Sequence, residues 1–198
     1  ELIQRAGMTN FSLDFMYGLP GQTMDSWRES LLKAVALSPT HISTYELTVE
    51  ENTPLFELIK SQNKESSPMQ MMPDEELILE MYDHAIDFLT SCGYEHYEIS
   101  NFAMPGFRCI HNLNYWDRGE YAGAGAAAHS FVNGTRSWNI KEIHDYIDHV
   151  NKGIIPEIEE PRLTPEEALK DFIFLGLKKT EGISVGKAGE KGLDILAG

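Results

Sequence analysis

The strongest constraint on the fold is a strand–turn–helix–strand succession near the start of the chain. Residues 11–18, FSLDFMYG, alternate between large apolar and smaller or polar side chains, which is the pattern of a strand with one buried face. A Pro-Gly turn follows, and Thr23 then begins a helix that ends at Ser38-Pro39. The next strand is predicted at 41–48. This order is typical of parallel βα units, so the chain is predicted to be an α/β protein.

Further elements are predicted downstream from the periodicity of apolar residues. Helices are expected at 73–93, 139–153 and 164–179, and a third strand is expected at 94–103. Residues 50–72 are expected to be irregular. The polar stretch 60–70 within them is predicted to be a mobile loop.

The acidic, proline-broken segment 154–162 predicts a domain boundary. Residues 1–153 would then form a β/α piece, and residues 163–198 would begin a small helical unit. The helical unit opens with Thr164, Pro165 and Glu167, which match a capping box.

Composition excludes several classes of function. The chain has 198 residues and a net charge of −15, a field that repels phosphate backbones, so no nucleic-acid partner is expected. No apolar run approaches the roughly 20 residues that a membrane helix needs. The chain has 2 cysteines, Cys92 and Cys109, which fits a reducing, cytoplasmic setting. Two thiols are too few to hold an iron–sulfur cluster alone, since clusters take about three or four.

Polar residues at the predicted strand ends are the first candidates for a site. Asp14 lies on the strand face opposite the large apolar side chains, where it could serve a site at the carboxyl edge of a parallel sheet or cap the adjacent turn. The other strand-end candidates are Glu46, Thr48, Glu98, Ser100 and Asn101.

The stretch CIHNLNYW, residues 109–116, is the second candidate. Cys109, His111 and the later His129 lack the paired spacing of a structural zinc site. An imidazole followed by Tyr115 and Trp116 could ligate haem iron, or could be a histidine packed on aromatic rings; the residues alone leave both interpretations open.

Four ordered motifs resemble one family, the oxygen-independent coproporphyrinogen III oxidase-like branch of the radical S-adenosylmethionine (SAM) proteins, and within it the HemW-type haem chaperone subfamily. They are LDFMYGLPGQT (13–23), STYELTVEENTP (43–54), YEHYEISNFAMPGFRCIHNLNYW (94–116) and EYAGAGAAAHSF (120–131).

The resemblance implies an incomplete (β/α)6 TIM-like radical SAM barrel, of which residues 1–153 would be the C-terminal part, with residues 154–162 as a linker and 163–198 as the start of the helical C-terminal domain. The family's [4Fe-4S] cluster sits on a Cys-x3-Cys-x2-Cys loop that this chain does not contain, so the chain corresponds to a C-terminal half. Three strands cannot close a barrel, and exposed sheet edges are expected.

The family's site residues carry over in two groups. The S-adenosylmethionine contacts match Asp14, Thr48 and His129. The H-N-x-x-Y-W motif, which is linked to haem binding, places His111 as a candidate iron ligand together with Asn112, Tyr115 and Trp116.

The implied function is a haem chaperone that binds haem and transfers it to apo-proteins. The alternative is an oxygen-independent coproporphyrinogen III oxidase, which decarboxylates a porphyrinogen in porphyrin biosynthesis. Whether the chain takes part in catalysis is left open by the sequence.

Overall fold

The computed structural model describes residues 2–61, 72–186 and 188–189 of the chain. The chain divides into two compact units, Glu1–Cys109 and Ile110–Gly198. No helix among the described residues is long and apolar enough to cross a membrane.

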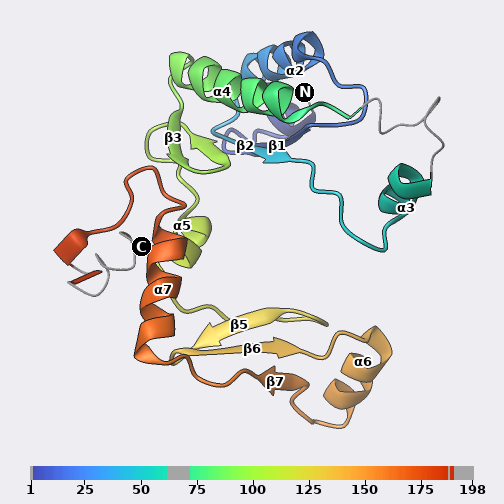
Figure 1. The fold of residues 1–198 in the computed structure, drawn as a ribbon, viewed down its shortest axis with the longest axis vertical. Helices are drawn as coiled ribbons and strands as arrows, with labels where there is room; N and C mark the ends of the chain where they lie inside the picture. Colours follow the sequence, from blue (N-terminus) through green and yellow to red (C-terminus); the bar gives the residue numbers. More distant parts are fainter. Residues whose placement is uncertain (1, 62–71, 187, 190–198) are drawn as a thin grey trace. The chain divides into compact units, whose positions relative to one another are not determined.

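The first unit is built on a 4-stranded sheet with the order β1-β2-β4-β3 (Figure 1). As predicted, β1 (Ser12–Tyr17) and β2 (His41–Glu46) are parallel. The prediction of a single third strand at 94–103 is wrong. These residues form a hairpin of β3 (Glu95–Glu98) and β4 (Asn101–Ala103), and β4 runs antiparallel to β2.

A tight turn explains the hairpin. The backbone N–H of Ser100 donates to the Glu98 carboxylate at 3.2 Å, and the N–H of Thr44 donates to the Ser100 carbonyl at 2.8 Å. The chain therefore reverses at Ile99 and Ser100, and β4 is anchored to the neighbouring strand.

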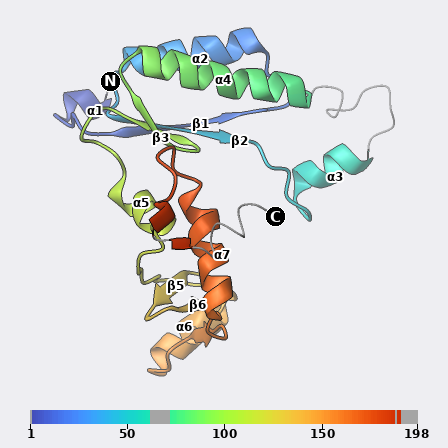
Figure 2. The ribbon, with the colours of Figure 1, turned by 60° about the vertical axis from the view of Figure 1, so that its left-hand side comes forward.

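Two helices cover one face of this sheet, as both ribbon views show (Figures 1 and 2). They are α2 (Met24–Ala36) and α4 (Glu75–Ser91). The short helix α1 (Leu2–Arg5) precedes them. The Trp27 indole N–H donates to the Met81 carbonyl at 2.8 Å and joins the two covering helices. The buried core contains Tyr17, Trp27, Leu31, Ala34, Ile42, Met81, Ala85, Leu89, Tyr94 and Phe102.

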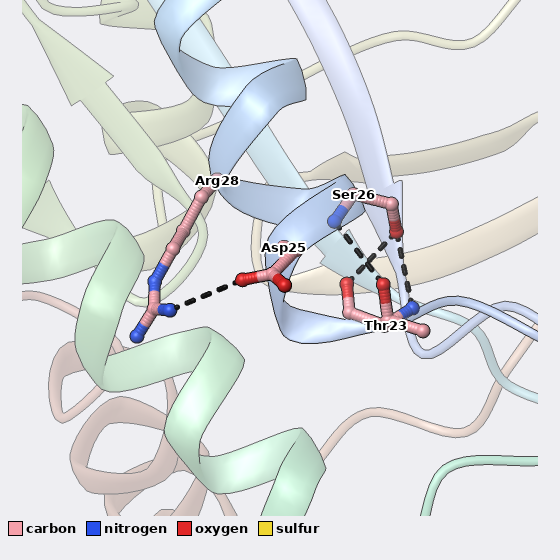
Figure 3. A network of polar contacts seen from close by, with 4 residues as sticks. All are labelled: Thr23, Asp25, Ser26 and Arg28. Carbon is pink, nitrogen blue, oxygen red and sulfur yellow. Dashed lines mark hydrogen bonds and ion pairs between the residues drawn. The ribbon is translucent and has the colours of Figure 1, made fainter.

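A capping box begins α2 at Thr23, the residue predicted to begin this helix (Figure 3). The Thr23 hydroxyl accepts from the Ser26 N–H at 3.2 Å, and the Ser26 hydroxyl accepts from the Thr23 N–H at 3.0 Å. Two N–H groups that the first helical turn cannot pair internally are thus satisfied.

The expectation of irregular structure at 50–72 is wrong for part of that range. Helix α3 spans Pro54–Ser61. The Thr53 hydroxyl accepts from the Phe56 N–H at 3.2 Å, and Pro54 occupies the first helical position, where a missing N–H costs nothing. The predicted mobile loop lies, from residue 62 onward, outside the described residues.

The second unit contains a 3-stranded antiparallel sheet with the order β5-β6-β7. The strands are β5 (His129–Val132), β6 (Thr135–Asn139) and β7 (Glu157–Glu159). The helices are α5 (Ile110–Trp116), α6 (Ile143–Asn151) and α7 (Pro165–Gly176). Figure 1 shows the strands side by side, with α6 joining two of them.

The segment 154–162 is not simply a connector, because it contributes β7. Ser137, Trp138 and Asn139 of β6 pair with it in register. An acidic, proline-containing sequence gives no alternating apolar signal, but an edge strand needs only backbone pairing on one side. The two compact units divide after Cys109. The domain boundary at 154–162 stays a prediction.

Candidate functional site

Asp14 lies on the sheet face that α2 and α4 do not cover. Leu13, Phe15 and Tyr17 pack on the core, so the pleat of β1 directs Ser12, Asp14 and Met16 to the opposite face. We call this surface the polar face. Asp14 is exposed there, as the alternating pattern predicts. It is the third residue of β1 and is paired in register with Ser43, so it sits in the middle of its strand rather than at the carboxyl end.

Neighbouring strands add two more polar groups, His41 and Tyr97, to the polar face. His41 is buried at the start of β2, and its Nδ1 lies 2.9 Å from the Ser12 hydroxyl. Its Nε2 lies 2.7 Å from the hydroxyl of Tyr97, a buried residue of β3. Burial lowers the pKa of His41, although the nearby charge of Asp14 acts in the opposite sense. Burial also raises the pKa of Tyr97 to about 12.

The carboxyl edge of the sheet holds a separate cavity of about 420 Å³. Because β4 is antiparallel to both β2 and β3, the carboxyl ends of β1, β2 and β3 lie at the same edge. Three of the residues predicted at strand ends meet here: Glu46, Thr48 and Ser100. The remaining lining residues are Tyr17, Tyr45, Ile78, Leu79, Tyr82 and Ile99.

The walls of this cavity are mainly aromatic and aliphatic. Burial, followed by the charge of Glu46, raises the pKa of Tyr17 to about 12, so its hydroxyl stays protonated at neutral pH. The Tyr82 hydroxyl donates to the Ile99 carbonyl at 3.1 Å. Asp14 does not line the cavity, and the predicted Glu98 and Asn101 are buried elsewhere.

The H-N-x-x-Y-W motif forms helix α5. Residues four apart share a helical face, so the motif contains two such pairs. His111 and Tyr115 form the first, with ring centroids 4.7 Å apart in an edge-on contact. Asn112 and Trp116 form the second.

The His111 side chain is exposed, and within the described residues its ring nitrogens make no hydrogen bond. Tyr115 also contacts Tyr121 edge-on, with centroids 4.6 Å apart. An exposed imidazole supported by an aromatic ring is available to a ligand from outside. Trp116 lines a cavity of about 500 Å³ together with Asp117, Phe172, Gly176, Lys179, Glu181, Gly182, Ile183 and Ser184.

His129 is the first residue of β5, belongs to the second unit and is exposed. Its ring lies beside Trp138, with centroids 6.1 Å apart. A Cβ added at Gly123 would collide with the His129 carbonyl oxygen, so the backbone packs closely at this point.

Sequence reasoning missed His41, Ser12 and Tyr97. The face that His41 occupies could have been predicted, because alternation along 41–48 places His41, Ser43 and Tyr45 on one face of the strand. The pairing of His41 with Tyr97 depends on strand order, which periodicity does not reveal. Among the described residues, no three or more His, Cys, Asp or Glu side chains gather as metal ligands would.

Comparison with known proteins gives a consistent set of relatives, although no family model matches the chain. It is 37% identical over 191 residues to a protein of Bacillus subtilis (strain 168) named heme chaperone HemW, covering 96% of the chain and 49% of that protein. The HemW of Lactococcus lactis subsp. lactis (strain IL1403) is 34% identical over 187 residues, covering 94% and 47%. That of Escherichia coli (strain K12) is 39% identical over 132 residues, covering 67% and 32%.

A solved structure shares the fold. Coproporphyrinogen III oxidase (HemN) from Escherichia coli, described as a radical SAM enzyme, matches with a TM-score of 0.74 at 20% identity, covering 98% of this chain and 47% of that one. The chain spans about half the length of the curated relatives that it matches. Over the residues that align, it belongs to the family of the proteins named heme chaperone HemW.

Proposed function

We propose that this chain is the C-terminal half of a haem chaperone, which binds haem and transfers it to an apo-protein. The observation that carries the proposal is the exposed imidazole of His111 on α5, which makes no hydrogen bond to any residue that the structure describes. Relatives that align with nearly the whole chain carry the name heme chaperone HemW, which supports the same function. Haem is then the cargo of the protein.

The proposed architecture is part of an incomplete (β/α)6 radical SAM barrel, with a helical domain beginning at 163. The likeness in fold to a radical SAM enzyme supports it. So does the position of β1, whose outer edge carries no partner strand among the described residues. Earlier barrel strands would pair along that edge. A [4Fe-4S] cluster would be held by a cysteine loop that precedes this half.

Asp14 and Thr48 of the first unit are the proposed S-adenosylmethionine contacts. His129, in the second unit, is a proposed contact on the resemblance alone. Two observations fit such a ligand. Thr48 lines a cavity with aromatic and aliphatic walls and few polar groups, the usual make-up of a small-molecule site. Asn101 Oδ1, on the polar face, is buried without a hydrogen-bond partner among the described residues and could accept an N–H from a ligand.

Bound beside a reduced [4Fe-4S] cluster, S-adenosylmethionine would accept one electron from it, lose methionine and so supply a 5′-deoxyadenosyl radical. The task of this chain's residues is to bind and orient it. The carboxylate of Asp14 accepts hydrogen bonds, and the Thr48 hydroxyl can donate or accept at the cavity rim.

The haem motif would act through both faces of α5. The His111 imidazole would ligate the iron, and contact with the Tyr115 ring would restrict rotation of the imidazole. Asn112 and Trp116 would contact the porphyrin or hold the helix beside its cavity. The acidic net charge of −15 gives no support for a nucleic-acid partner, and we propose that the protein acts in the cytoplasm.

The test is a haem titration of the full-length protein, followed through the Soret band. We expect His111→Ala to weaken haem binding by about tenfold or more, because even the outer partners of a metal ligand contribute that much. His144→Ala, an exposed histidine on α6, is the matched control and should bind as the wild type does.

Equal affinities and spectra for the two variants would refute His111 as a ligand. Formation of protoporphyrinogen by the cluster-loaded protein, assayed without oxygen, would instead identify the oxidase reaction.

A further inference from the structure

The polar face contains a continuous series of hydrogen bonds that the proposed function does not require. The Cys109 N–H donates to the Tyr97 hydroxyl at 3.2 Å, and that hydroxyl lies 2.7 Å from His41 Nε2. His41 Nδ1 lies 2.9 Å from the Ser12 hydroxyl, which reaches Asp14 Oδ1 at 3.4 Å. The last contact is the longest and weakest of the series. The series ends at Asp14, the proposed S-adenosylmethionine contact.

The chemistry of the two end groups determines which group donates and which accepts in each hydrogen bond. An ionised carboxylate only accepts, so Ser12 donates its single hydroxyl proton to Asp14. The Ser12 oxygen must then accept from His41, which places the ring proton on Nδ1. Nε2 is left as an acceptor for the Tyr97 hydroxyl. The Tyr97 oxygen in turn accepts the Cys109 N–H.

We infer that Ser12, His41 and Tyr97 are positioning residues that form a one-directional hydrogen-bond relay, which orients the Asp14 carboxylate and connects it to the backbone at Cys109. Cys109 comes two residues before His111 in the sequence. The inference rests on the proposed function, because Asp14 is there assigned to S-adenosylmethionine.

Two further observations support the relay. Burial lowers the pKa of His41, which keeps the ring neutral and able to accept at Nε2. The Tyr97 ring is held by Arg108, whose guanidinium lies over it, 5.8 Å from the centroid. Arg108 is itself anchored, because its Nε pairs with Glu95 at 2.8 Å. A fixed hydroxyl position sets the orientation of the imidazole, and through Ser12 that of the carboxylate.

The first test is the tautomer of His41, read by nitrogen NMR of the full-length protein with isotope-labelled histidine. His41→Gln identifies the resonances that belong to this ring. We expect a neutral ring with its proton on Nδ1 and a hydrogen-bonded, unprotonated Nε2. A proton on Nε2 would reverse the series and overturn the inference.

The second test compares two substitutions at Ser12, an exposed residue whose replacement leaves the core intact. In the cluster-loaded full-length protein we expect Ser12→Ala to bind S-adenosylmethionine about fivefold more weakly, the net effect of one ordinary hydrogen bond. Ser12→Thr keeps the hydroxyl and should restore the affinity. Tyr97→Phe should weaken binding as Ser12→Ala does, and should speed amide exchange at Cys109.

The outcomes separate this inference from the proposed function. If Asp14→Asn abolishes binding while Ser12→Ala and Tyr97→Phe bind as the wild type does, the relay is wrong and Asp14 keeps its role. If the wild-type protein binds no S-adenosylmethionine, the proposed role of Asp14 fails, and the tautomer of His41 alone decides the relay.

Discussion

Asp171 illustrates how much one side chain can determine in the second unit. Its carboxylate accepts from Arg118 Nε at 2.8 Å and from Arg136 Nη2 at 2.7 and 2.9 Å. Arg118 also lies over the Phe131 ring, 4.9 Å from the centroid. The three charged residues come from the turn after α5, from β6 and from α7. One carboxylate therefore pairs with two guanidinium groups and joins three parts of the unit.

We expect Asp171→Ala to lower the free energy of unfolding by about 2 kcal/mol, because two guanidinium groups would face each other without a carboxylate. The cost is below that of a fully buried pair, since the Arg136 side chain is 37% exposed. Urea unfolding of the variant and the wild type measures this loss in the free energy of unfolding. Asp148→Ala, which removes an exposed pair with Lys152, is the control. Equal stability of the two variants would contradict the prediction.

At the scale of elements, the start of α2 depends on local hydrogen bonds rather than on the core. The capping box of Thr23 and Ser26 is exposed, and the helix then buries Trp27, Leu31 and Ala34. The cap decides where the helix begins, and the apolar face decides where it packs. The Asp25–Arg28 ion pair in the same turn, at 3.4 Å, is exposed and contributes little (Figure 3).

Replacing Thr23 by Ala should therefore destabilise the protein by about 1 kcal/mol, the usual cost of a lost N-cap hydroxyl. Thr23→Ser retains the hydroxyl and should unfold close to the wild-type denaturant concentration. If the two variants unfold at the same concentration, the cap hydrogen bonds do not set the stability of α2.

For the whole molecule, the two units differ in how much apolar surface they bury. The first contains most of the fully buried side chains, among them Trp27, Ile42 and Phe102. In the second, Phe131 and Ile173 are buried, but Ile143, Ile147 and Val150 of α6 are 64%, 46% and 51% exposed. The predicted apolar face of α6 therefore exists but does not pack on a core among the described residues.

Amide hydrogen exchange should reveal this difference. We expect the slowest exchange in β2, which lies between β1 and β4 and beneath the covering helices, because opening it requires exposing the main core. Amides of β5, β6 and β7 should exchange faster. Protection in the second sheet equal to that of β2 would show that its stability has another source.

Local patterns were sufficient for most individual elements. Alternation predicted β1 and the polar position of Asp14, and a capping sequence predicted the starts of α2 and α7. Four ordered motifs indicated the family, and the relatives confirm it. These signals depend on residues within a few positions of one another, so they can be read before the chain folds. The roles assigned to Thr48, His111 and His129 stay predictions.

Only the tertiary structure decided how the strands pair. The reversal at Ile99 and Ser100, which makes two antiparallel strands from one predicted strand, depends on hydrogen bonds to β2. The contact of His41 with Tyr97 joins residues 56 apart in the sequence, and that of Arg136 with Asp171 joins residues 35 apart. Side-chain periodicity indicates which face of its strand or helix a residue occupies. Periodicity does not indicate which distant strand lies beside that residue, because the packing of the whole unit selects which strands pair.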